Sequence, residues 1–177
     1  SNIKMTWHNT SRVNIASPWM INDMRPLSGP NTINGYVMLN NTNLQIEGNW
    51  QITPSAFVEG IQSGYGNLTY LAAYSGSTLT LAGTFNNMFF FGNSSGVTYL
   101  TTGTFNNVSA ILTERCTGWT WSRQNVTGTA TFSSIQIATN VTLILRDGAF
   151  SFDSRSGGGL FQLVNAIVTV AGKAVFS

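Results

Sequence analysis

The chain repeats one short phrase five times, and this repetition restricts its fold more than any other feature does. In each copy a strand-like apolar run is followed by glycine and then by a second short apolar run. The glycines lie 20, 25, 20 and 24 residues apart, at Gly83, Gly103, Gly128, Gly148 and Gly172. A period of this length is typical of stacked repeats, in which each repeat buries its apolar face against the next. The phrase therefore predicts a solenoid.

From residue 34 onward each repeat holds about three short apolar runs, which fits an all-β parallel β-helix whose runs pair with those one coil above. Residues 34–177 would form about six coils. In this division residues 53–68 are an insertion, and residues 160–164 are equivalent to residues 135–138. We expect the repeated glycine to make a corner, because φ > 0 has no steric cost for glycine.

An antiparallel β-sandwich of the pilin type is the alternative fold. Asp147 and Gly148 lie between two apolar runs, and Asp-Gly is a strong hairpin signal. A meander of longer strands would show a similar period. The near-identical residues 82–87 and 102–107 favour the solenoid, because they imply equivalent positions in successive coils.

Residues 1–33 lack the phrase, and we assign them to a separate segment in front of the solenoid domain at 34–177. Their apolar residues alternate with polar ones, which is the pattern of a strand with one buried face. The segment either caps the open end of the solenoid or leaves its own subunit and completes a neighbour's sheet. The residues that would make these assembly contacts are Ile3, Met5, Trp7, Val13 and Ile15.

Charged residues make up only 8% of the chain, against roughly 25% in ordinary soluble domains. Neutral polar residues supply the polarity instead, which is typical of long-lived surface structures rather than of cytosolic enzymes. The net charge is +2, and the Lys and Arg residues form no cluster. Binding to a phosphate backbone needs several such contacts, so we expect no nucleic-acid partner. No apolar run reaches ~18 residues, so we expect no membrane insertion.

Residues 157–161 read Gly-Gly-Gly-Leu-Phe, and together with residues 166–177 they resemble the repeats of secreted parallel β-helix proteins. That group includes autotransporter passengers, polymorphic outer-membrane adhesins and phage tailspikes. The resemblance covers the pattern of residues 34–177, although Gly-Gly-Gly-Leu occurs only once. It implies a location outside the cell, at a cell surface or at a virion surface. It transfers no catalytic residue.

The sequence offers no catalytic or metal-binding constellation. Cys116 and His8 are the only cysteine and histidine, too few for a Zn²⁺ site, and we expect Cys116 to be a small buried hydrophobe. Some proteins of the resembled group cleave polysaccharides, and a glycosidase needs two carboxylates, here from Glu114, Asp147 or Asp153. Acids at corners are usually solvated turn residues. We therefore expect no enzymatic activity, no cofactor and no metal.

Aromatic residues are the candidates for binding a glycan or a partner protein. Trp119 and Trp121 share one face of a short run. If they are exposed they could stack on sugar rings, and if they are buried they would fill a wide coil. The candidate binding residues are Trp119, Trp121, Arg115, Arg123, Tyr65, Tyr70 and Tyr74.

Asparagine-linked sequons are frequent in this chain. In a source that glycosylates secreted proteins, the sequons at exposed corners should carry glycans. The sequon asparagines are Asn9, Asn40, Asn67, Asn93, Asn107, Asn125 and Asn140.

Together these features predict a non-enzymatic structural or adhesive protein on an outer surface. It would assemble with itself or with adjoining subunits of a filament or virion and present a binding surface, with surface glycans as further partners. Two alternatives stay open. One is a pilin-like filament subunit polymerised by N-terminal donor-strand exchange. The other is a tailspike-type module that binds or cleaves polysaccharide.

Overall fold

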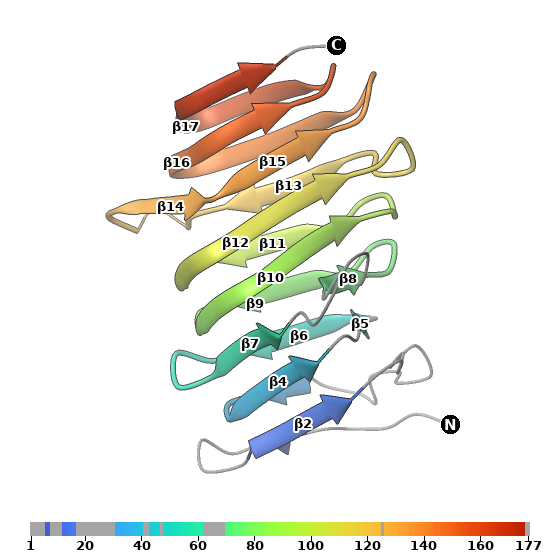
Figure 1. Cartoon of the computed structure of the whole chain (residues 1–177), viewed down its shortest axis with the longest axis vertical. Coiled ribbons are helices and arrows are strands. Elements are labelled where there is room, and N and C mark those ends of the chain that lie inside the picture. Colours follow the sequence, from blue (N-terminus) through green and yellow to red (C-terminus); the bar gives the residue numbers. More distant parts are fainter. Residues whose placement is uncertain are drawn as a thin grey trace.

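The computed structural model describes residues 6–7, 12–16, 31–40, 43–46, 48–61, 70–124 and 126–175. In these residues the chain forms strands and turns and no helix, so the described part holds no helix that could span a membrane. The strands form one 17-stranded sheet that winds repeatedly around a common axis (Figure 1). Every pairing between the described strands is parallel. The predicted parallel β-solenoid is confirmed, and the antiparallel sandwich is wrong.

The sheet has three faces, and the long last strands, β16 (Thr142–Ser156) and β17 (Leu160–Val175), cross all of them. Face A contains β1 (Thr6–Trp7), β3 (Asn31–Ile33), β6 (Asn49–Ile52), β9 (Thr78–Leu81), β11 (Thr98–Thr101), β13 (Trp119–Ser122) and the first parts of β16 and β17. Face B contains β2 (Arg12–Ala16), β4 (Tyr36–Asn40), β7 (Phe57–Ile61), the first parts of β10 (Thr84–Gly92) and β12 (Thr104–Leu112), β14 (Thr129–Phe132) and the middle of β16 and β17. Face C contains β5 (Asn43–Ile46), β8 (Tyr70–Ala73), the second parts of β10 and β12, β15 (Ser134–Ile137) and the ends of β16 and β17.

Strands of the N-terminal segment pair within their own chain. β1 pairs with β3 and β2 pairs with β4, both in parallel, so faces A and B extend into residues 1–33. The division between residues 33 and 34, and the choice between a cap and an exchanged strand, stay predictions. Of the predicted assembly residues, β1 and β2 contain Trp7, Val13 and Ile15, and two lie outside the described residues, Ile3 and Met5.

Two details of the predicted coils are wrong. Within the predicted insertion at 53–68, residues 57–61 instead form β7, which pairs with both β4 and β10. Residues 160–164 pair with residues 142–146 and not with residues 135–138, so the last coil lies one face away from its predicted position. β16 and β17 cross the corners without a break in the strand. The sequence therefore does not mark where each of these strands passes from one face to the next.

Alternating side chains of each strand fill the solenoid, as a pleated strand requires. In β9, for example, Leu79 and Leu81 are buried while the threonines beside them are half-buried. Aromatic rings of successive coils contact one another along the axis. The ring centroids of Tyr99 and Trp121 are 4.4 Å apart, and each such pair adds about 0.5–1.5 kcal/mol beyond the area it buries.

Two of the repeated glycines, Gly83 and Gly103, are needed for close packing rather than for their backbone angles. Gly83 and Gly103 occupy equivalent corners between faces A and B, and neither has φ > 0. A Cβ added at Gly103 would lie 2.1 Å from the carbonyl oxygen of Gly83 in the preceding coil. At the same corner of a later coil Gly128 has φ 87, as the sequence predicts, and left-handed glycines also occur in the turns from face C to face A, at Gly76, Gly96 and Gly118.

We expect Gly103→Ala to lower the free energy of unfolding by more than about 2 kcal/mol, because the methyl group would overlap a backbone oxygen. Gly76→Ala is the matched control. A Cβ at Gly76 meets nothing within 4 Å, so its cost is that of alanine at φ +75, about 1–2 kcal/mol. Urea unfolding followed by circular dichroism compares the two variants. Equal midpoints would contradict the packing role of Gly103.

Candidate functional site

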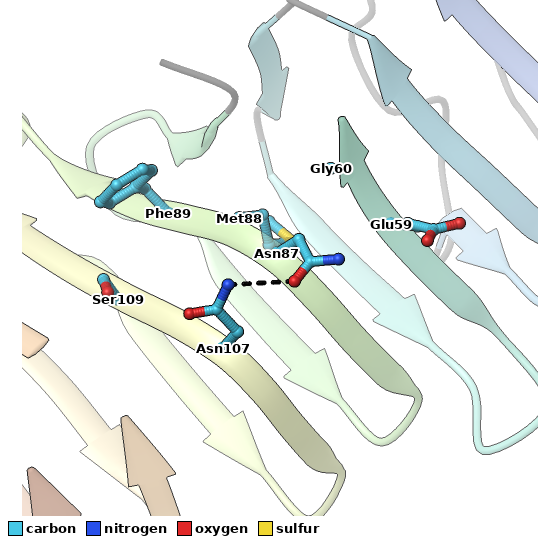
Figure 2. A pocket seen from close by; sticks show the side chains of 7 residues that line it. All are labelled: Glu59, Gly60, Asn87, Met88, Phe89, Asn107 and Ser109. Atoms are coloured by element: carbon cyan, nitrogen blue, oxygen red, sulfur yellow. Dashed lines mark hydrogen bonds between the residues drawn. The ribbon is translucent and has the colours of Figure 1, made fainter. Parts of the chain in front are cut away.

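A groove opens between β7 and β10 (Figure 2). β7 pairs with β4 along its whole length, but it pairs with β10 only at residues 57–59. Beyond Asn86, β10 turns onto face C and pairs with β8 instead. The two strands diverge at this point, and the space between them is about 390 Å³. The groove is lined by Glu59, Gly60, Asn87, Met88, Phe89, Asn107 and Ser109.

Asparagines in the left-handed region make the corner between faces B and C. Asn87 has φ 53 and Asn107 has φ 51, angles that asparagine adopts more readily than most residues because its short side chain can form local hydrogen bonds. Nδ2 of Asn107 donates to Oδ1 of Asn87 at 3.0 Å, and the hydroxyl of Ser133 donates to Oδ1 of Asn107 at 3.3 Å. The corner is therefore held by a side-chain ladder that runs from coil to coil.

This ladder has a direction, and its direction leaves a hydrogen-bond donor in the groove. Each asparagine oxygen accepts from the coil that follows, so Asn87 uses its Oδ1 within the ladder. Its Nδ2 has no hydrogen-bond partner among the described residues. Figure 2 shows this nitrogen on the side of Asn87 that faces Glu59.

Glu59 provides an acceptor on the opposite side of the groove. Its side chain is half-buried, and the hydroxyl of Tyr36 donates a hydrogen bond to its Oε2. The ring of Tyr36 in turn stacks on that of Phe57, with centroids 5.3 Å apart and planes 10° apart. These contacts hold the carboxylate in place. Glu59 lines the groove from β7, although Figure 2 shows its carboxylate directed away from Asn87, so the anionic acceptor and the amide donor belong to opposite walls without facing each other.

Half-buried aromatic side chains lie on face C beside these polar groups. Phe89 lines the groove directly and lies opposite Tyr70 in the parallel ladder. Two residues further along β10, Phe91 contacts the ring of Tyr70, with centroids 4.9 Å apart. Of the predicted tyrosines, Tyr70 therefore lies near the groove, Tyr74 is half-buried in the turn after β8, and Tyr65 lies outside the described residues.

The two tryptophans predicted as a binding pair lie in the core. Trp119 and Trp121 are each 1% exposed, and Trp121 stacks on Tyr99. This burial contradicts the prediction that they contact a ligand, and it agrees with the alternative that they fill a wide coil. Their spacing identified a shared face of β13, but spacing alone cannot tell an inner face from an outer one.

The two arginines predicted beside the tryptophans differ in solvent exposure. Arg115 is exposed in the turn after β12. Arg123 is only 4% exposed, and its guanidinium donates to the carbonyl oxygens of Thr101 and Thr127, both at 3.4 Å. Burial lowers the pKa of Arg123. These hydrogen bonds hold the backbone at a corner of the solenoid, and the burial of the side chain contradicts an exposed binding role for Arg123.

The sequons are distributed over several coils. Asn93, Asn107 and Asn140 are exposed, and a glycan on Asn107 would replace one of the two hydrogens of the Nδ2 that donates to Asn87. Glycosylation itself stays a prediction. Of the other sequon asparagines, Asn40 ends β4, and the remaining ones lie outside the described residues, namely Asn9, Asn67 and Asn125.

The acids considered for catalysis lie at different corners of the solenoid. Glu114 is exposed in the turn after β12, and Asp153 is exposed on β16 as it leaves face B. Asp147 lies between faces A and B with φ 60, and its Oδ2 accepts a hydrogen bond from Ser122 at 3.0 Å. The described residues contain no group of three His, Cys, Asp or Glu side chains that could hold a metal ion.

Cys116 is a buried free thiol, as the sequence predicts. Its sulfur packs against Gly92, where an added Cβ would lie 2.7 Å from Sγ. Burial raises the pKa of Cys116 to about 12, so the thiolate that a nucleophile needs is scarce at neutral pH. Burial also raises the pKa of Tyr99, and the charge of a Cys116 thiolate would raise it further.

A second surface of interest is the open end of the last coil, formed by β17 at the top of Figure 1. β17 pairs with β16 on one side and with no described strand on the other. Its register places Leu163 over Leu145 and Val168 over Phe150, both in the core, so these side chains point inward. They are nevertheless accessible, and Leu163 is 48% exposed. An open hollow of about 720 Å³ at this end is lined by Arg155, Gly158, Gly159, Leu160, Phe161, Leu163, Val168 and Val170.

Comparison of the chain with family models, with curated proteins and with solved structures gives no match in any of the three. The resemblance to secreted parallel β-helix proteins therefore stays a prediction. Its architectural part, the parallel β-solenoid, is confirmed by the structure.

We expect Trp121→Ala to lower the free energy of unfolding by about 3–5 kcal/mol, because it removes a large side chain from a packed core. A surface tryptophan would change stability by less than about 0.5 kcal/mol. Urea unfolding measures the difference, with Arg115→Ala as an exposed control from a nearby position. A near-neutral Trp121→Ala would contradict the buried placement.

The free energy of unfolding should fall as the pH rises above 9.0, the ordinary pKa of the thiol, toward about 12, its pKa in the fold. In that window the unfolded chain releases the proton of Cys116 while the folded chain keeps it, so alkaline pH favours unfolding. The raised pKa of Tyr99 acts in the same direction. Urea titrations across this window measure the slope, which should be smaller for Cys116→Ala. An identical slope in that variant would exclude a contribution from the thiol.

Proposed function

We propose that this protein is a structural module of an outer surface that assembles through the open end of its last coil. The observation that supports this proposal best is the exposed cross-section of the core at β17. Leu163 is 48% exposed, although its register places it among the inward-facing residues. An apolar surface next to an unpaired strand edge is typical of a site that another strand covers.

A coil of the same kind is the partner that fits this end best. Strand addition along β17 would satisfy its edge, and an apolar coil would cover its inward-facing side chains. A second copy can supply such a coil from its first strands. Among the described strands, β1 and β2 each pair on one side only. Both run parallel to the strands that they pair with, so they could continue the parallel ladder beyond β17 of the first copy. Head-to-tail contacts of this type are heterologous and produce filaments or rings.

The outer-surface location rests on composition. Only 8% of the residues are charged, and neutral polar side chains cover the outward faces, as at Thr104 and Asn106 on face B. The pilin-like alternative assumed an antiparallel sandwich, and the parallel solenoid removes that basis. The tailspike-type alternative stays a prediction, as does an adhesive role for the assembled protein.

We expect Leu163→Arg to weaken self-association at least about 100-fold, because it would place an unpaired charge in an apolar contact at a cost of several kcal/mol. Ile167→Arg is the matched control. Ile167 lies on the same strand and is 71% exposed, but it alternates with the inward-facing Val168 and so points to the side of the solenoid. Sedimentation velocity over a range of protein concentrations measures both variants.

Circular dichroism should show that both variants keep the fold. A wild-type chain that stays monomeric at every concentration would refute the proposed assembly. So would equal weakening by the two substitutions, because only one of them lies on the end of the coil.

A further inference from the structure

We infer that the groove between β7 and β10 is a binding site for a neutral saccharide, with Asn87, Glu59 and Phe89 as its main contacts. This site is separate from the end of β17 on which the proposed assembly depends, and the inference does not require that assembly. It rests on the hydrogen-bonding groups, the charge and the aromatic wall of the groove.

The polar groups of the groove suit a ligand that both donates and accepts hydrogen bonds. Nδ2 of the exposed Asn87 is a donor with no protein partner among the described residues, so a ligand that binds it needs an acceptor. The carboxylate of Glu59 needs a donor beyond the one that Tyr36 supplies. A hydroxyl group meets both needs. An ammonium group can only donate, and a phosphate or carboxylate can only accept.

Charge narrows the class of ligand further. Among the described residues Glu59 is the only charged one that lines the groove, and its charge would repel an anionic ligand. A hydroxyl that donates to its carboxylate forms a charge-assisted hydrogen bond, which is stronger than a neutral one. These features favour a neutral ligand rich in hydroxyl groups.

The aromatic wall fits the apolar faces of such a ligand. A sugar ring carries hydroxyl groups around its rim and C–H groups on its faces, and the half-buried side chain of Phe89 lines the groove and offers an apolar surface to such a face. Tyr70 and Phe91 continue the aromatic surface along face C, so that a chain of several sugar units could extend from the groove. The volume of about 390 Å³ lies within the common range for small-molecule sites, about 300–1,000 Å³.

A peptide also donates and accepts, but the strands leave it little edge to pair with. β10 uses the edge that faces the groove to bind β7 at residues 84–86 and β8 at residues 89–90. On β7 only residues 60–61 lie beyond the paired part. Strand addition, the usual mode for an extended peptide, needs a longer edge than this.

The binding groups are fixed before a ligand arrives. Asn87 is held by its bond from Asn107, and Glu59 by its bond from Tyr36. Groups that are already ordered lose less conformational entropy on binding. A site of this kind can therefore bind a neutral sugar without rearrangement of the solenoid.

The test begins with the purified full chain on an array of neutral and acidic oligosaccharides, followed by calorimetry with the neutral binders. Asn87→Asp keeps Oδ1 for Asn107 but replaces the donor with an oxygen, and it should lower the affinity at least tenfold. Asn86→Asp is the matched control. Its Oδ1 accepts the same kind of bond from Nδ2 of Asn106, at 2.7 Å, but it does not line the groove, and its affinity should stay within about twofold of wild type.

Phe89→Ser gives a second test that leaves the asparagine ladder unchanged, and it should also lower the affinity at least tenfold. The inference is overturned if no neutral oligosaccharide binds at millimolar concentration, or if the two Asp variants lose affinity equally. Binding of a peptide library that is sensitive to Asn87→Asp, with no sugar binding, would overturn it as well. Repeating the calorimetry with Leu163→Arg separates this inference from the proposed assembly, because sugar binding should survive in the monomer.

Discussion

Backbone hydrogen bonds between successive coils are the interaction on which the rest of this structure depends. Because the strands are parallel and in register, each residue lies over its equivalent in the next coil, as Phe85 lies over Phe105. Aromatic rings of successive coils therefore contact one another in the core, where the ring centroids of Phe85 and Phe105 are 5.5 Å apart. Side-chain amides contact one another at the corner, where Asn106 donates a hydrogen bond to Asn86. The aromatic interior and the asparagine ladder are both consequences of this register.

The repeat predicted the architecture because stacking equivalent residues is what makes a sequence periodic. The phase of the last coil could not be predicted, since Asp147 and Asn165 turn β16 and β17 through corners where earlier coils use a glycine. Residue spacing placed Trp119 and Trp121 on one face, but burial depends on the whole coil. The groove was missed because it forms where β7 and β10 diverge, although the two Thr-Phe-Asn-Asn copies at 84–87 and 104–107 mark its corner.

The two surfaces described above differ in how they are built. The groove lies on the side of the solenoid, and its polar groups are held by hydrogen bonds that belong to the fold. The open end at β17 consists of inward-facing apolar side chains that no further coil covers among the described residues. Because the groove at β7 and β10 and the end at β17 lie at different heights along the axis (Figure 1), an occupied groove leaves the end accessible. The proposed saccharide binding and the proposed assembly are therefore compatible in one molecule.

The column of aromatic rings has a consequence for how the molecule comes apart. Phe90, Tyr99, Trp119, Trp121 and Phe132 make their mutual ring contacts in the coils of β10 to β14. In a linear array each coil is supported only by its neighbours, so opening spreads inward from an end. Ring contacts continue from Phe132 through Phe152 to Phe161, so the last coil is joined to these coils as well. Under tension along the axis, the coils before β10 would separate first, because their described residues make fewer ring contacts between coils.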